Sequence, residues 1–228
     1  MNMFLAAGFV LVFCLNVGVV EGCMCLPRHP QASFCSADFA LKGMVIKKYT
    51  KKDMTNAAMF EMLGLEVPVN AYYDILVMKV YKGNVTAKED TYASFFKATI
   101  QTSAHQATCG TEFDKGKSYL FTGRIFNGEL QVNKCDWTKE YKTLTPSMKR
   151  GIKGEYQCNK CKINTCMNGH CDNESKCKWE INYNQPIDEC TAQHRICKVN
   201  KEGECGWNNG LFYQACSNKI ILDLYKPS

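Results

Sequence analysis

The sequence lacks the patterns that mark common enzyme active sites. Its four histidines, His29, His105, His170 and His194, are scattered and do not form a His-Glu-x-x-His motif. It contains no glycine-rich phosphate loop, and its residues suggest no nucleophile triad. We therefore predict a protein that is not an enzyme and has no cofactor of its own.

Long apolar segments are absent after residue 22. Within residues 1–22, Phe4–Phe13 is almost wholly apolar but shorter than the ~20 residues that a membrane-spanning helix needs. Val20 and Gly22 are small residues at the minus-three and minus-one positions of a signal-peptidase cut before Cys23. We predict that residues 1–22 are a signal peptide, that the secreted mature chain begins at Cys23, and that no segment spans a membrane.

Cysteine, by contrast, is abundant. The chain has 15 cysteines, and 14 remain once Cys14 is lost with the signal peptide. An even and high count in a secreted chain predicts disulfides. Because cysteines crowd the last third of the chain, we predict a domain boundary at Cys158, between an N-terminal domain at 23–157 and a smaller, disulfide-dependent domain at 158–228. The spacing Cys158-x2-Cys161-x4-Cys166-x4-Cys171 also fits a zinc site, which a secreted context disfavours.

Segments rich in β-branched and aromatic residues predict five strands in the first domain. They lie at Phe39–Tyr49, Tyr72–Tyr81, Thr91–Ile100, Lys117–Phe126 and Glu129–Trp137. Asn127-Gly128 is a strong hairpin signal between the last two strands, and Gly43 indicates a β-bulge in the first. Five strands with short helices fit a small OB-type barrel, although the pattern alone also fits other all-β folds.

Proline and lysine mark three other segments. Pro30 predicts a short helix through Cys35, and Thr145-Pro146 predicts another toward Ile152. Between the first two strands, Thr50–Asn70 has weak periodicity and a basic start. We predict a long loop there, which is either functional or simply solvated.

The formal net charge of +6 bears on possible partners. A mildly basic secreted chain can contact acidic matrix polysaccharide or an acidic protein face, whereas it rarely meets nucleic acid. Asn84-Val85-Thr86 and Asn173-Glu174-Ser175 are glycosylation sequons, so we predict glycans on Asn84 and Asn173.

The N-terminus of the predicted mature chain carries distinctive chemistry. If the chain begins at Cys23, one residue holds a free α-amine, a peptide carbonyl and a half-cystine. A neutral amine and the neighbouring carbonyl oxygen can close a five-membered chelate around a zinc ion. The following residues continue as Cys-x-Pro-x-His-Pro-Gln-x-x-Phe-Cys-x-x-Asp, which ends at Asp38.

This opening stretch, Cys23–Asp38, resembles the N-terminus of the tissue inhibitors of metalloproteinases. Further similarities follow at Val80-Tyr81-Lys82-Gly83, Thr108-Cys109-Gly110, Lys134-Cys135-Asp136, Cys161–Cys166, Cys177-x-Trp179, Cys197 and Cys205-Gly206-Trp207. The resemblance implies a mainly β chain, with a netrin-like five-stranded OB-type barrel followed by a small disulfide-rich α+β domain.

The resemblance also implies a disulfide pattern, which spacing alone does not determine. The implied pairs are Cys23–Cys109, Cys25–Cys135, Cys35–Cys158, Cys161–Cys205, Cys166–Cys171 and Cys177–Cys197. Cys190 and Cys216 have no counterpart in the family, and we pair them with each other. Met24 is a further departure, because relatives usually carry Ser or Thr there. In addition, Cys158 and Cys161 are separated by two residues instead of one.

By resemblance, the chain is a secreted inhibitor of zinc metalloendopeptidases of the matrix type, and related membrane-anchored proteases are further candidate targets. Cys23 would bind the zinc of the protease, and the chain would act as a monomer in 1:1 complexes. The implied contact residues are Cys23, Met24, Cys25, Leu26, Pro27, Ala107, Thr108, Cys109 and Gly110. The alternative class is a non-inhibitory netrin-like module that binds matrix or a receptor. A zinc-finger protein would instead carry free thiols or bound metal.

Overall fold

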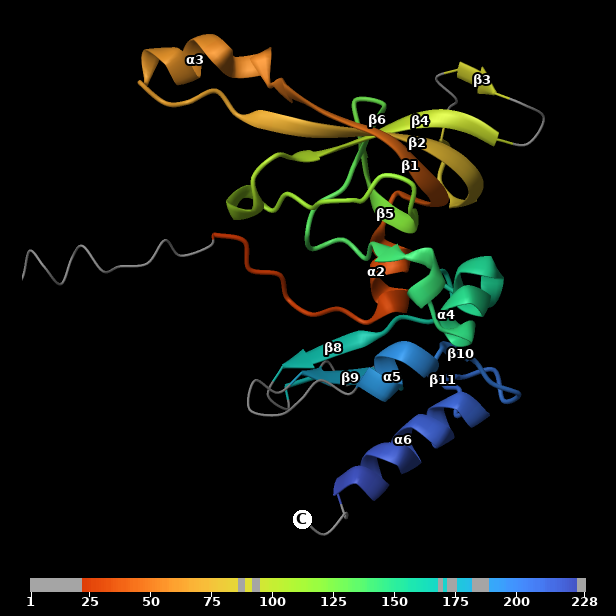
Figure 1. Ribbon diagram of the computed structural model, residues 1–228. Coiled ribbons are helices and arrows are strands. Elements are labelled where there is room, and N and C mark those ends of the chain that lie inside the picture. Colours follow the sequence, from red (N-terminus) through yellow and green to blue (C-terminus); the bar gives the residue numbers. More distant parts are fainter. Residues whose placement is uncertain are drawn as a thin grey trace, which may run out of the picture.

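The computed structural model describes residues 22–85, 89–91, 95–167, 170–171, 176–181 and 189–224 (Figure 1). The predicted signal peptide, apart from Gly22, and the sequon at Asn173 lie outside these residues. Among the described residues, no helix combines the length and apolar character needed to cross a membrane.

Five strands form a closed ring in the first half of the chain. These are β1 (Phe39–Lys52), β2 (Val69–Lys82), β4 (Phe95–Ser103), β5 (Ser118–Phe126) and β6 (Glu129–Gln131). The order is β1-β2-β4-β6-β5, and β5 pairs back with β1. All pairs in the ring are antiparallel except β4 with β6. The predicted mainly β fold with a five-stranded ring is confirmed.

The core of the ring follows the two-residue period of its strands. Inward side chains alternate along β1 and β2 and are fully or almost fully buried, as at Leu41, Tyr73 and Ile75. The register of β1 against β2 shifts at Lys42/Gly43, where Gly43 was predicted to form a bulge. The turn Asn127-Gly128 joins β5 to β6, and both residues have positive φ angles, as a tight hairpin turn requires.

The prediction of a loop at Thr50–Asn70 is wrong. Strands β1 and β2 pair as far as Lys52 and Val69, so the hairpin projects from the ring as a long arm (Figure 1). The tip holds a short 3-10 turn, η1 (Met54–Asn56), and helix α3 (Ala57–Met62). Cross-strand packing sustains this pairing beyond the core, because the rings of Tyr49 and Tyr72 stack at a centroid distance of 5.5 Å.

Two predicted strand ranges are also wrong. Within the predicted strand Thr91–Ile100, Thr91 ends a separate strand, β3 (Glu89–Thr91), which pairs antiparallel with β4. The predicted strand Glu129–Trp137 ends at Gln131, because a side-chain-stabilised turn at Asn133–Asp136 replaces the strand. A two-residue strand, β7 (Lys139–Glu140), then pairs with β5.

Short helices and strands complete the chain. Helix α2 (Pro30–Ser36) agrees with prediction, and His29 caps its first turn. Helix α4 (Pro146–Arg150) is capped by the Thr145 hydroxyl and runs into a π-helical turn, η4 (Gly151–Glu155). Two more 3-10 turns are η2 (Gln106–Thr108) and η3 (Tyr141–Thr143). The second half contains β8 (Asn164–Met167), β9 (Lys178–Ile181), α5 (Glu189–His194), β10 (Cys197–Val199), β11 (Cys205–Trp207) and α6 (Leu211–Leu224).

Helix α2 joins the two halves of the molecule. A second core cluster unites Phe34 of α2 with Tyr156 and with Ile196 of the last third of the chain. The buried Gln31 side chain donates to the carbonyl of Cys197 at 2.8 Å and accepts from its amide at 2.9 Å. The two halves therefore share a packed interface, whereas the domain boundary at Cys158 stays a prediction.

We expect Gln31→Leu to lower the free energy of unfolding by about 2–4 kcal/mol, because it removes two buried hydrogen bonds to the backbone of Cys197. Chemical denaturation of both proteins measures the difference. Gln131→Leu is the matched control, since its side chain makes one long hydrogen bond of 3.4 Å to Gln101. Equal stability of the Gln31 variant and the parent would contradict this account of the interface.

Candidate functional site

The segment Cys23–Pro27 runs along the outside of the barrel without regular structure. Its residues alternate in exposure. Cys23, Cys25 and Pro27 are partly buried, whereas the Met24 side chain is 91% exposed and that of Leu26 is 56% exposed. The cysteines are thus turned toward the protein, and the two apolar side chains between them are presented to solvent.

Two disulfides fix this segment to separate loops of the barrel. Cys23 is bonded to Cys109, and Cys25 is bonded to Cys135. The two anchoring loops are themselves joined, because the amide of Lys134 donates to the carbonyl of Cys109 at 2.8 Å. The predicted contact residues 23–27 and 107–110 therefore lie together as one tip.

The loop Ala107–Gly110 is held by its own hydrogen bonds. The amide of Gly110 and the hydroxyl of Thr108 both donate to the carbonyl of His105, at 2.9 and 3.0 Å. A Cβ atom at position 110 would lie 2.3 Å from the carbonyl oxygen of Ser103, so only glycine fits there. Cys109 has a φ of 62°, which turns the chain sharply at the disulfide.

The second anchor is a turn at Asn133–Asp136. The Asp136 carboxylate accepts from the amide of Asn133, and the Asn133 side chain accepts from the amide of Cys135, both at 2.8 Å. Burial raises the pKa of Asp136, while the bond from Asn133 acts in the opposite direction. We predicted a strand here and not an anchor, although Asn and Asp at this spacing are a turn signal.

Three sulfur atoms gather at the tip. The Sγ atom of Cys23 lies 3.9 Å from the Sγ atoms of Cys25 and Cys135, and all three lie within 4.8 Å of one another. This spacing resembles a metal site, but each sulfur belongs to a disulfide and has no thiolate to offer. The cluster is therefore the packing of two adjacent disulfides.

The remaining cysteines after residue 22 are also joined in pairs. The bonds are Cys35–Cys158, Cys161–Cys205, Cys166–Cys171, Cys177–Cys197 and Cys190–Cys216. With the two bonds at the tip, these are the seven pairs that we expected. Because the first four cysteines after residue 157 all lie in disulfides, the alternative zinc site at Cys158–Cys171 does not exist in this structure.

The other predicted sites lie away from the tip. Asn84 is exposed just after the end of β2, where its side chain is accessible to a glycan. The carbonyl of His105 supports the loop of the tip, whereas His29 and His194 are not part of the tip. His29 is buried against the rings of Trp179 and Trp207, and His194 stacks on Phe212 in the second half of the chain.

The family model described as tissue inhibitor of metalloproteinase matches residues 21–207. Metalloproteinase inhibitor 3 of Scyliorhinus torazame is 32% identical over 84% of this chain and 83% of its own length. Metalloproteinase inhibitor 3 of Gallus gallus is 30% identical over 96% of this chain and 98% of its own length. The tissue inhibitor of metalloproteinase of Drosophila melanogaster is 24% identical over 91% of both chains.

The family match begins before Cys23 and continues through Trp207, so it includes the tip, the barrel and most of the second half. The relatives are named as inhibitors of proteases rather than as enzymes. Because the family model matches most of its length, the chain belongs to the tissue inhibitor of metalloproteinase family.

Proposed function

We propose that the mature chain inhibits zinc metalloendopeptidases by placing the α-amine and carbonyl oxygen of Cys23 on the catalytic zinc of the protease. Membership of the family supports metalloproteinase inhibition. The observation that carries the finer mechanism is the tip itself, in which two disulfides hold an exposed Met24 directly after Cys23. The zinc belongs to the protease, and the inhibitor brings no metal of its own.

The chemistry follows from what a metalloprotease requires. Its zinc has three protein ligands and an open position for the water that attacks the peptide bond. In the full chain the nitrogen of Cys23 is a peptide nitrogen bonded to Gly22. Removal of residues 1–22 turns it into an amine with a lone pair, and the amine and carbonyl of Cys23 then displace the water. Because a protonated amine cannot bind zinc, binding releases a proton.

Rigidity explains how a short exposed segment inhibits without being cleaved. A flexible peptide loses conformational freedom when it binds, whereas the tip is already held by Cys109 and Cys135. If the protease cleaved the backbone of the tip, the two disulfides would keep the new chain ends in place, whereas the products of an ordinary substrate leave. Residues Cys23–Pro27 and Ala107–Gly110 then enter the active-site cleft together as one rigid wedge.

Met24 is proposed to occupy the protease pocket that takes the residue after the scissile bond. Its flexible thioether side chain suits an irregular apolar pocket. Met24→Ala should weaken inhibition by roughly tenfold to a hundredfold, since burial of a Met side chain contributes about 1.5–3 kcal/mol. The melting temperature should not change, because the side chain is 91% exposed.

Inhibition constants and thermal melts test this prediction together. Leu211→Ala is the control, since Leu211 is an 82% exposed apolar side chain on α6. It should change neither quantity. A large loss of stability in Met24→Ala with unchanged inhibition would show that Met24 serves the fold instead.

The function as a whole is tested by titration of a purified zinc endopeptidase with the mature protein. We expect activity to fall to zero at one inhibitor per enzyme, as for a monomer in a 1:1 complex. N-terminal sequencing of the secreted protein should identify Cys23 as its first residue. The seven disulfides fit the secreted, extracellular location that we propose. Absence of inhibition by a protein that begins at Cys23 would favour the alternative, a non-inhibitory binding module.

A further inference from the structure

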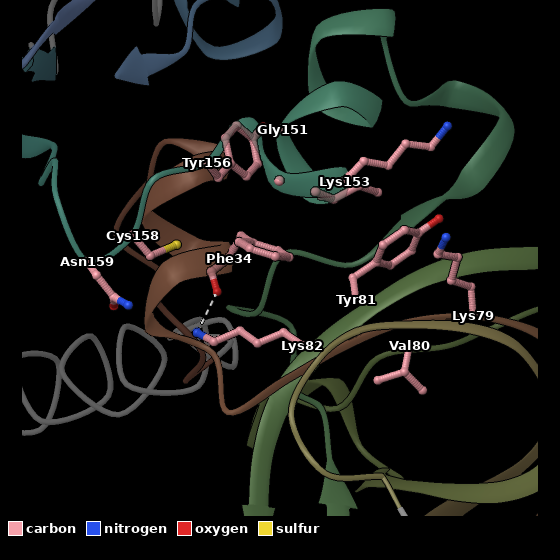
Figure 2. A pocket seen from close by; sticks show the side chains of 12 residues that line it. Phe34, Lys79, Val80, Tyr81, Lys82, Gly151, Lys153, Tyr156, Cys158 and Asn159 are labelled. Atoms are coloured by element: carbon pink, nitrogen blue, oxygen red, sulfur yellow. Dashed lines mark hydrogen bonds between the residues drawn. The ribbon is translucent and has the colours of Figure 1, made fainter. Parts of the chain in front are cut away.

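A hollow of about 410 Å³ lies between strand β2 and the π-helical turn η4, on a part of the surface that the tip does not use. Helix α2 and the segment up to Asn159 border the hollow on other sides, and it is open to solvent (Figure 2). Phe34, Tyr81 and Tyr156 give it aromatic walls. It is therefore a shaped pocket with apolar surface, at the junction of the two halves of the chain.

Three lysines and no acidic residue line this hollow. Lys79 and Lys82 come from β2, and Lys153 comes from η4. In Figure 2 the ammonium group of Lys82 lies toward one end, and those of Lys79 and Lys153 lie toward the other. The pocket thus has a positive charge at each end and an apolar middle.

The charge of Lys82 is only partly compensated. Its ammonium group is partly buried and donates to the carbonyls of Phe34 at 3.1 Å and Cys35 at 2.7 Å, at the end of helix α2. Burial is the main cause that lowers the pKa of Lys82, while the charge of Asp38 acts in the opposite direction. Neutral carbonyls satisfy hydrogen bonds but do not neutralise a partly buried cation.

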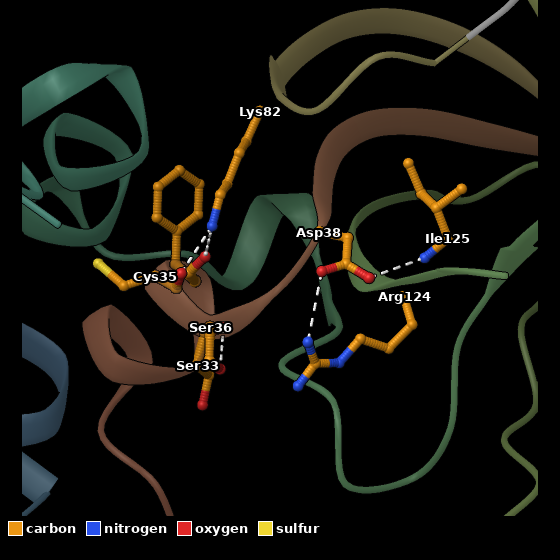
Figure 3. Close-up of polar contacts among 8 residues, drawn as sticks. Ser33, Cys35, Ser36, Asp38, Lys82, Arg124 and Ile125 are labelled. Carbon is orange, nitrogen blue, oxygen red and sulfur yellow. Dashed lines mark hydrogen bonds and ion pairs between the residues drawn. The ribbon is translucent and has the colours of Figure 1, made fainter. Parts of the chain in front are cut away.

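The carboxylates nearby are bound elsewhere. Asp38 accepts from Arg124 at 3.3 Å and from the amide of Ile125 at 3.1 Å (Figure 3). Glu155 of η4 pairs with Arg150 at 3.0 Å and Lys198 at 3.6 Å.

Among the described residues, the three lysines of the hollow therefore have no carboxylate in ion-pair contact, although the more distant charge of Asp38 acts on Lys82. Within the described part of the chain, none of Lys79, Lys82 and Lys153 takes part in an ion pair.

We propose that this hollow binds a short acidic segment of a partner polypeptide. Carboxylates at the two ends of the segment meet Lys82 and the Lys79–Lys153 pair, and an apolar residue between them packs on Phe34 and Tyr81. The Cα atoms of Lys79 and Lys82 lie about 10 Å apart along β2, which matches the backbone of an extended tetrapeptide, and long acidic side chains at its two ends extend its reach toward the ammonium groups. Sulfated polysaccharide is disfavoured, because it follows rows of cations on open surface, whereas these cations are divided by an aromatic wall.

The test uses the mature protein and a capped peptide, Glu-Leu-Leu-Glu, in a calorimetric titration. The neutral isostere Gln-Leu-Leu-Gln should bind at least tenfold more weakly, and added salt should weaken the acidic peptide further. The double variant Lys79→Gln/Lys153→Gln should also lose roughly tenfold in affinity. Both side chains are exposed, so the fold should tolerate the change. Lys115→Gln/Lys201→Gln removes the same charge at exposed positions outside the hollow and should bind as the parent does.

Equal affinity for the two peptides, or equal losses in the two double variants, would overturn the proposal. So would binding of a sulfated oligosaccharide at this site in place of the acidic peptide. Inhibition of a zinc endopeptidase by Lys79→Gln/Lys153→Gln should match the parent, so this proposal and the proposed inhibitory function fail or succeed independently.

Discussion

Replacing both Cys23 and Cys109 by serine is expected to weaken inhibition of a zinc endopeptidase by tenfold or more, although the α-amine and carbonyl of residue 23 remain. The chelating atoms are unchanged, but the bond that holds them against the Ala107–Gly110 loop is lost. A mobile N-terminus must be ordered when it binds, and that ordering costs affinity. Inhibition constants of the mature parent and of the double variant measure the effect.

The same variant should lose stability as well. Because Cys25–Cys135 remains, the loop that the Cys23–Cys109 bond closes is roughly 30 residues, which corresponds to about 3–4 kcal/mol. Inhibition is therefore measured well below the melting temperature. The control is Cys190→Ser/Cys216→Ser, which opens the disulfide between α5 and α6. It should lose stability but inhibit as the parent does. Equal losses of inhibition in both variants would show that a bridge acts only through stability.

The barrel could be predicted from the sequence where strand signals are local. The alternation of buried and more exposed side chains in β1 and β2, like the Asn127-Gly128 turn, can be recognised from a few neighbouring residues. The arm at Thr50–Asn70 could not be recognised in this way, because its strands pair through residues about 20 apart in the sequence, such as Lys51 and Asn70. Within the arm neither strand has a buried face, so nothing there imposes an alternation of apolar and polar residues on the sequence.

The tip required a different kind of information. Cys23 and Cys109 are 86 residues apart, so neither spacing nor periodicity reveals their bond. The resemblance supplied the pairing, whereas the local anchors at Ser103, His105 and Asn133 appeared only in the structure. The role of Gln31 was also hidden, because its partner Cys197 lies 166 residues away and is contacted through backbone atoms.

Adding one alanine before Cys23 of the mature protein should cause the largest loss of inhibition. The α-amine becomes a planar amide nitrogen, whose lone pair is not available to a metal. The added atoms also enter the space beside the zinc. Losing a metal bond and gaining a clash should cost several kcal/mol, and each ~1.4 kcal/mol is a factor of ten in affinity. We therefore expect inhibition to fall by roughly a thousandfold or more.

The fold should accept this extension. In the full chain Gly22 occupies the added position, and a Cβ atom built there lies 3.5 Å from the carbonyl oxygen of Ala107, an ordinary contact distance. Cys23–Cys109 and Cys25–Cys135 can form as before, so the thermal melt should match that of the parent. A protein with one alanine added after Ser228 is the matched control and should inhibit fully.

The most direct test of the mechanism is therefore the inhibition constant of the Ala-extended protein against one purified zinc endopeptidase, measured beside the protein that begins at Cys23. Chelation by the α-amine predicts an extended protein that is folded but inhibits at least a thousandfold less well. Equal inhibition constants for the two folded proteins would contradict the mechanism.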